Sequence, residues 1–167
     1  MIIRGGHNID PMSIEEPLYG LEDIKTVAAV GRPDAHAGEV PVVYVELAPG
    51  SKTTAEDILA YAGEHIGERA AVPKEVVIMD EIPLTPIGKI FKPALAWDAA
   101  KRAYERELAA LGDLAKTVSV EVGEDKIHGK SALIIVTPNS GVSEGDILNK
   151  INELLTRYTM QYRVEFQ

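Results

Sequence analysis

Residues 83–90 read Pro83-Leu84-Thr85-Pro86-Ile87-Gly88-Lys89-Ile90 and place one lysine on a stiff turn. The two prolines restrict the backbone, and Gly88 supplies a dihedral angle that most residues cannot adopt. Pro93 suits the first turn of a helix, so we expect Lys89 on a loop just ahead of a helix that runs to about residue 111. A lysine ammonium is a compact positive charge, which suits a reaction that builds negative charge on phosphate oxygens.

Two further segments lie on the N-terminal side of this turn. The first reads Ile2-Ile3-Arg4-Gly5-Gly6-His7-Asn8-Ile9-Asp10-Pro11-Met12-Ser13-Ile14-Glu15-Glu16, and the second reads Val30-Gly31-Arg32-Pro33-Asp34 followed by Gly38-Glu39-Val40-Pro41. Taken alone, the glycine pair is simply a turn. Pro11 begins a short helix, and Glu15 in its first turn is expected to serve the helix start and not the chemistry.

Together, at this spacing, the three segments resemble the C-terminal domain of the acyl-adenylate-forming ligases. This superfamily includes fatty-acyl-CoA synthetases, aryl-CoA ligases, luciferases and peptide-synthetase adenylation domains. The resemblance covers residues 1 to about 110 and implies an α+β fold, in which a small central sheet is flanked by helices. The sequence Phe91-Lys92-Pro93 is similar to bacterial fatty-acyl-CoA synthetases and points to an aliphatic acyl substrate.

The resemblance also implies roles for individual residues. Lys89 would be the catalytic residue of adenylation, in which a carboxylate attacks the α-phosphate of ATP and pyrophosphate leaves. Gly5 and Gly6 would line the tunnel through which the pantetheine of CoA reaches the acyl-adenylate. Asn8 would lie near the nucleotide phosphate.

Some positions depart from the family pattern. Relatives often carry Tyr-Lys where this chain has Ala70-Ala71, and often an aromatic residue at Ala37. These departures weaken the case for direct CoA contacts from those two loops, but they do not affect Lys89. His7 is not expected to be catalytic.

The implied enzyme is an AMP-forming acid–thiol ligase that works by two half-reactions. The domain would act as a lid that rotates about a hinge just before residue 1 and presents different loops to one site in turn. The opening strand, which runs straight into a glycine turn, indicates a cut inside a longer protein. The isolated chain is expected to be inactive, because the acyl pocket and adenine site would lie in a missing N-terminal adenylation domain.

That N-terminal domain is also expected to hold most of the ATP and its magnesium, with CoA as co-substrate. No metal site is expected in this chain, because His36, His65 and His128 have no metal-ligand spacing.

The chain changes character near Gly112-Asp113, which we take as the junction between a lid domain (residues 1–112) and a small ββαβ extension (residues 113–167). Strands are expected at 117–122, 131–137 and 161–166, with a helix at 143–157. A unit of this size is marginally stable alone, so we expect it to dock or to self-associate.

The overall composition excludes several classes of function. The 26 Asp and Glu outnumber the 17 Lys and Arg, giving a net charge of −9 that disfavours nucleic acid and anionic membrane partners. The absence of cysteine rules out a disulfide framework and a thiol nucleophile. No apolar run approaches the roughly 18–20 residues of a membrane span. A cytoplasmic protein is therefore expected.

Two alternatives stay open on the sequence. One is a non-enzymatic interaction or oligomerisation module that uses the edge strands of the extension. The other is the lid of a ligase that acylates a carrier-protein thiol, since the lid motifs are shared between the two kinds of ligase.

Overall fold

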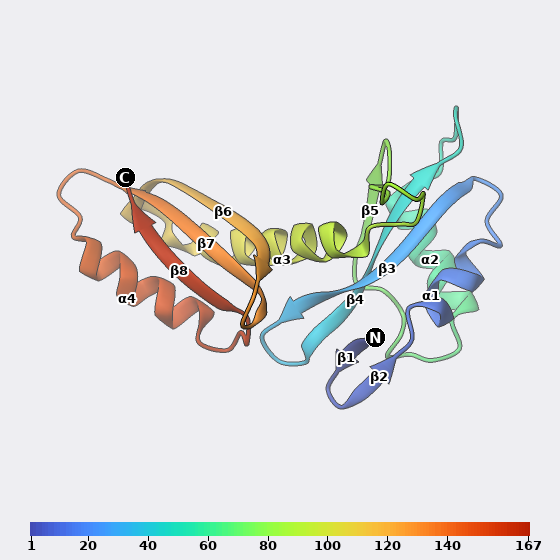
Figure 1. Cartoon of the computed structure of the whole chain (residues 1–167), viewed down its shortest axis with the longest axis horizontal. Helices are drawn as coiled ribbons and strands as arrows, with labels where there is room; N and C mark the ends of the chain where they lie inside the picture. The colour runs from blue at the N-terminus through green and yellow to red at the C-terminus, as the bar shows by residue number, and fades with distance from the viewer. The chain divides into compact units, whose positions relative to one another are not determined.

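The computed structural model describes all 167 residues, which form two compact units with separate cores (Figure 1). The first unit contains residues 1–32 and 37–96, and the second contains residues 33–36 and 97–167. Helix α3 (Lys92–Leu108) belongs to both, because its C-terminal half packs into the core of the second unit. The predicted boundary between a lid domain (residues 1–112) and an extension (residues 113–167) stays a prediction.

A five-stranded sheet forms the centre of the first unit. Strands β1, β4 and β3 lie side by side with β2 at the edge, and β5 pairs in parallel with β4. The strands are β1 (Ile2–Arg4), β2 (His7–Ile9), β3 (Ile24–Asp34), β4 (Gly38–Leu47) and β5 (Val76–Met79). Strand β1 pairs with the beginning of β4, where Arg4 lies opposite Gly38. Strand β5 pairs with the end of β4, where Met79 lies beside Glu46.

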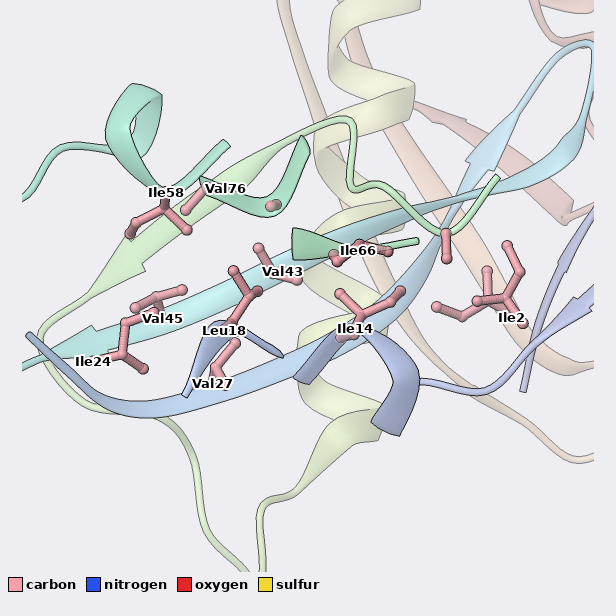
Figure 2. Packing of buried hydrophobic residues seen from close by; sticks show 14 residues of the cluster. Ile2, Ile14, Leu18, Ile24, Val27, Val43, Val45, Ile58, Ile66 and Val76 are labelled. Carbon is pink, nitrogen blue, oxygen red and sulfur yellow. The ribbon is translucent and has the colours of Figure 1, made fainter. Parts of the chain in front are cut away.

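Helices α1 (Met12–Leu18) and α2 (Ala55–His65) cover one face of this sheet (Figure 1). Figure 2 shows Ile14 and Leu18 of α1 pointing toward Val43 and Val45 of β4, and Ile58 of α2 joins the same cluster. All five side chains are buried. Each buried aliphatic side chain of this kind contributes about 1.5–3 kcal/mol of hydrophobic free energy, which fixes the helices on the sheet.

The second unit is built on a three-stranded sheet in the order β6-β7-β8, with β6 and β7 antiparallel and β7 and β8 parallel. Its elements after α3 are the 3₁₀ helix η1 (Ala109–Leu114), β6 (Ala115–Asp125), β7 (Gly129–Pro138), α4 (Glu144–Leu155) and β8 (Gln161–Phe166). The predicted ββαβ order is confirmed, although β6 and β7 are longer than expected.

Both α3 and α4 pack on one face of the second sheet. Tyr104 of α3 and Ile147 of α4 belong to the same buried cluster as Val120 and Ile134 of the strands. The Tyr104 hydroxyl donates to the Met160 carbonyl at 2.9 Å, which satisfies a polar group inside this core. The two α+β units together hold four α-helices and two small sheets, as the predicted fold class requires.

Candidate functional site

Residues 83–91, here called the lysine hairpin, close on themselves. Leu84 and Ile90 form an antiparallel bridge, and the Phe91 N–H donates to the Pro83 carbonyl at 2.8 Å. At the tip, the Thr85 N–H donates to the Lys89 carbonyl at 2.7 Å. The segment predicted to be a stiff loop with Lys89 on a turn is therefore a small hydrogen-bonded hairpin.

Thr85 and Gly88 shape the tip of the lysine hairpin. The Gly88 N–H donates to the Thr85 carbonyl at 2.8 Å, and the Lys89 N–H donates to the Thr85 hydroxyl at 3.1 Å. Gly88 has φ +79°, while a β-carbon there would meet nothing within 4 Å. Glycine is needed at this position for its backbone conformation and not for space.

The Lys89 side chain is exposed and makes no hydrogen bond or ion pair within the chain. Two apolar neighbours on the hairpin are exposed as well, Leu84 at 54% and Ile87 at 79%. The hairpin thus presents one uncompensated cation between apolar side chains. Such a cation is available to an anionic group supplied from outside the chain.

A buried carboxylate holds the N-terminal end of the hairpin. Glu46 near the end of β4 is 9% exposed and accepts from the Ile82 N–H at 3.3 Å. It also accepts from the Lys25 ammonium. The hydrogen bond from Lys25, and after it the one from Ile82, hold the pKa of Glu46 below its usual value.

A second carboxylate holds the C-terminal end. Glu15 of α1 accepts from the Lys92 ammonium at 2.6 Å and from the Ala29 N–H at 2.7 Å. Glu15 lies in the first turn of α1, but its carboxylate is engaged with β3 and with the start of α3. This contact could not be predicted from local sequence patterns, because Glu15 and Lys92 are 77 residues apart.

Gly5 and Gly6 form the two-residue turn between β1 and β2. Their φ angles are +53° and +88°, and Arg4 pairs with His7 across the turn. Positive φ at both central residues is the geometry that two-residue hairpins favour. The turn was predicted from the sequence, whereas strand β2 was not predicted. Asn8 lies in β2, exposed and opposite Ile3.

No hydrogen bond or ion pair joins Lys89 to Gly5, Gly6 or Asn8. The glycine turn lies at the β1 side of the first unit, and the lysine hairpin lies near the other end of β4 (Figure 1). The predicted site residues therefore form two separate places on one unit. Such separation is compatible with a lid that presents two loops in turn.

A pocket of about 520 Å³ lies beside the glycine turn and is lined by Arg4, Gly5, His7, Ala37, Glu68, Arg69 and Ala70. The Arg4 guanidinium donates to the Ala70 carbonyl at 2.6 Å, and His7 lies 3.6 Å from Glu68. Ala37 and Ala70 are two of the positions at which the sequence departs from the family pattern. Their small side chains line the pocket that contains Gly5.

The segment around Gly31 ties β1 to the strands β3 and β4. A β-carbon at Gly31 would come within 2.6 Å of the Glu39 carboxylate, and this carboxylate accepts from the Ile3 N–H at 3.1 Å. Gly31 thus allows Glu39 to reach β1. Strand β3 continues to Asp34, and β4 begins at Gly38.

No group of three or more His, Asp or Glu side chains is arranged to hold a metal ion. The residues present therefore do not fit a magnesium site. None of the helices has the length and apolar character needed to cross a membrane.

Residues 13–89 match the AMP-binding enzyme C-terminal domain, and the matched segment ends on Lys89. This segment is a member of that family. Gly5, Gly6 and Asn8 precede the matched range.

Individual relatives extend the finding. Marinolic acid–CoA ligase of a Pseudoalteromonas species is 39% identical over 166 residues, which is 99% of this chain and 25% of that protein. A Mycobacterium tuberculosis fatty acyl CoA synthetase structure is 34% identical, with a TM-score of 0.53 over 57% of this chain and 19% of its own. ATP-bound MatB from Rhodopseudomonas palustris is 25% identical, with a TM-score of 0.55 over 57% of this chain and 19% of its own.

The AMP-binding C-terminal domain is thus homologous to domains of AMP-forming acid–CoA ligases. The chain spans a quarter or less of the length of these three relatives. Because the match to the marinolic acid ligase covers almost the whole chain, that ligase shares both units and not only the first.

Proposed function

We propose that this chain is the C-terminal lid of an ATP-dependent acyl-CoA synthetase, with Lys89 as its catalytic side chain in adenylation. The observation that carries the proposal is the exposed, unpaired ammonium of Lys89 on a hydrogen-bonded hairpin. Its position at the end of the matched family segment supports the same role. The ATP-bound state of the related MatB structure supports ATP as the co-substrate.

In the proposed first half-reaction, a carboxylate oxygen of the acid attacks the α-phosphorus of ATP. The bond from that phosphorus to the oxygen bridging to the β-phosphate breaks, so that acyl-adenylate and pyrophosphate form. Negative charge grows on the bridging and equatorial oxygens, and the Lys89 ammonium stabilises it. The apolar Leu84 and Ile87 beside it would pack against the adenylation domain and exclude water.

In the proposed second half-reaction, the lid rotates and the thiol of CoA attacks the acyl carbon, with AMP as the leaving group. Gly5 and Gly6 would then form the wall along which the pantetheine passes, with Asn8 near the nucleotide phosphate. The pocket beside Gly5 supports this assignment, because Arg4 and Arg69 line it and phosphate groups favour arginine. A fatty acid is the acyl substrate that we propose, and the cytoplasm is the proposed location.

The proposal is tested by joining the chain to its adenylation domain and measuring acyl-adenylate formation. Lys89→Ala should slow it by about a hundredfold or more, because a preorganised charged donor contributes several kcal/mol to such a transition state. Lys52→Ala is the matched control, since Lys52 is also exposed and without a partner. Equal rates of adenylate formation in the two variants would contradict the role of Lys89.

A further inference from the structure

Glu15 is more buried and makes more hydrogen bonds than a residue that only stabilises the start of a helix requires. Its side chain is only 14% exposed, and one oxygen, Oε1, accepts from both the Lys92 ammonium and the Ala29 N–H. The contact therefore joins three elements, α1, β3 and the first residue of α3. A charge-assisted hydrogen bond to a carboxylate that is itself held in place restricts the motion of a flexible partner side chain.

That partner is Lys92, which stands three residues after Lys89. The residue between the hairpin's bridge and Lys92 is Phe91, whose N–H closes the hairpin on Pro83. Lys92 therefore anchors the base of the lysine hairpin to the body of the first unit. With Glu46 at Ile82, each end of the hairpin is held by one carboxylate.

The same contact separates the charges of the two lysines. Lys92 is compensated by Glu15, whereas Lys89 has no partner. In the segment 82–92 only one cation is thus left for a ligand. A flexible Lys92 with no partner would add a second, unplaced charge to this loop.

We propose that Glu15 is a positioning residue for adenylation, acting through Lys92 to hold the lysine hairpin in place. This inference rests on the proposed function of Lys89. It predicts that the loss of Glu15 affects the half-reaction that uses the hairpin and spares the one that uses the glycine turn.

The decisive variants are Glu15→Gln, Lys92→Met and Lys92→Arg, each made in the chain joined to its adenylation domain. Glu15→Gln keeps an oxygen that can accept from the Ala29 N–H, but it removes the charge that binds Lys92. Adenylate formation should fall about tenfold in Glu15→Gln and Lys92→Met, less than the ~100-fold that a fully displaced group can cost. Lys92→Arg keeps the ion pair and should restore most of the rate.

The second half-reaction is measured separately, from preformed acyl-adenylate and CoA, and should be unchanged in all three variants. Glu75→Gln is the matched control, because Arg32 and Glu75 form an ion pair of similar burial away from the hairpin, with N–O distance 2.6 Å. It should leave both half-reactions unchanged. A loss in Glu15→Gln that is equal in both half-reactions, or equal to that in Glu75→Gln, would overturn the inference.

A readout without activity uses the 167-residue chain alone. Amide hydrogen exchange at Phe91 and Thr85, which close the hairpin, should be faster in Glu15→Gln than in the wild type and unchanged in Glu75→Gln. Unaltered exchange in Glu15→Gln would overturn the anchoring role.

The inference and the function on which it rests fail in different ways. If Lys89→Ala leaves adenylation intact, the proposed function is wrong. If Lys89→Ala abolishes adenylation and Glu15→Gln does not slow it, only the positioning role is wrong.

Discussion

Gly5, Gly6 and Gly88 have positive φ angles, and a β-carbon at any of them would meet nothing within 4 Å. At these turns the sequence was informative, because a glycine pair and a Pro-Ile-Gly sequence specify local backbone geometry with no help from the rest of the fold. The same open space means that an added side chain would clash with no part of the chain, so that beyond the backbone strain of positive φ only a ligand would contact it.

Gly6→Asn tests this last point, since asparagine tolerates positive φ better than most residues. We expect the variant to fold and to form acyl-adenylate normally, but to form thioester slowly, because the new side chain would project into the proposed path of pantetheine. Gly141→Asn is the control, with φ +82° and equally open surroundings in the second unit. Thioester formation by both variants is measured from purified acyl-adenylate and CoA, and adenylate formation is measured from acid and ATP. Equal thioester rates in the two variants would remove the glycine turn from the CoA path.

Glu46 provides a test of the hairpin's other anchor. Because hydrogen bonds from Lys25 and Ile82 hold its pKa below the usual value of about 4.3, the carboxylate stabilises the fold above that pH. This stabilisation is lost as the pH falls through the lower, folded pKa. Lys25→Met should raise the pKa of Glu46, as followed by carboxyl ¹³C NMR. An unchanged titration midpoint would show that Lys25 does not set it.

At the scale of elements, segments with a periodic apolar pattern could be predicted from the sequence. Short polar segments that depend on a distant partner could not. The strands predicted at 117–122, 131–137 and 161–166 are present as β6, β7 and β8. Strand β2 was missed because His7-Asn8-Ile9 has no apolar alternation and exists only as the partner of β1. The contacts of Glu15 and Glu46 were missed for a similar reason, since each depends on long-range pairing.

Helix α3 shows a different limit of sequence reasoning. Its apolar periodicity predicted one long helix, but not that Ala100, Tyr104 and Leu108 would pack with the strands and α4 of the second unit. A helix stripe indicates that a face is buried, and it does not say against what. The compact units therefore divide within a helix that the sequence places wholly in the first domain.

Tyr104→Phe tests how much this packing depends on a single polar group. The Tyr104 hydroxyl is buried and donates to the Met160 carbonyl, so its removal should lower the free energy of unfolding by about 1 kcal/mol. In Tyr162→Phe the lost hydrogen bond, to Asn152, is exposed, and a smaller effect is expected. Urea unfolding of both variants measures the difference. Equal destabilisation would contradict a special role for the buried hydroxyl.

At the scale of the whole molecule, we propose that the chain contributes parts of a site and not a complete one. Lys89 and the glycine turn are on its surface, while no metal-binding cluster is present. The family could be predicted from three short segments, whereas the proposed acyl pocket lies in a domain outside this chain. Self-association through residues 113–167 stays a prediction, and the sequence match to marinolic acid–CoA ligase extends over these residues.

The two half-reactions of the Lys89→Ala variant, assayed separately, test the central claim most directly. Acyl-adenylate formation from acid and ATP should fall by about a hundredfold or more. Thioester formation from preformed acyl-adenylate and CoA should proceed at the wild-type rate, because we propose that this step uses the glycine turn and not Lys89. A variant that forms adenylate normally, or that loses both steps equally, would contradict the assignment of Lys89 to the first half-reaction.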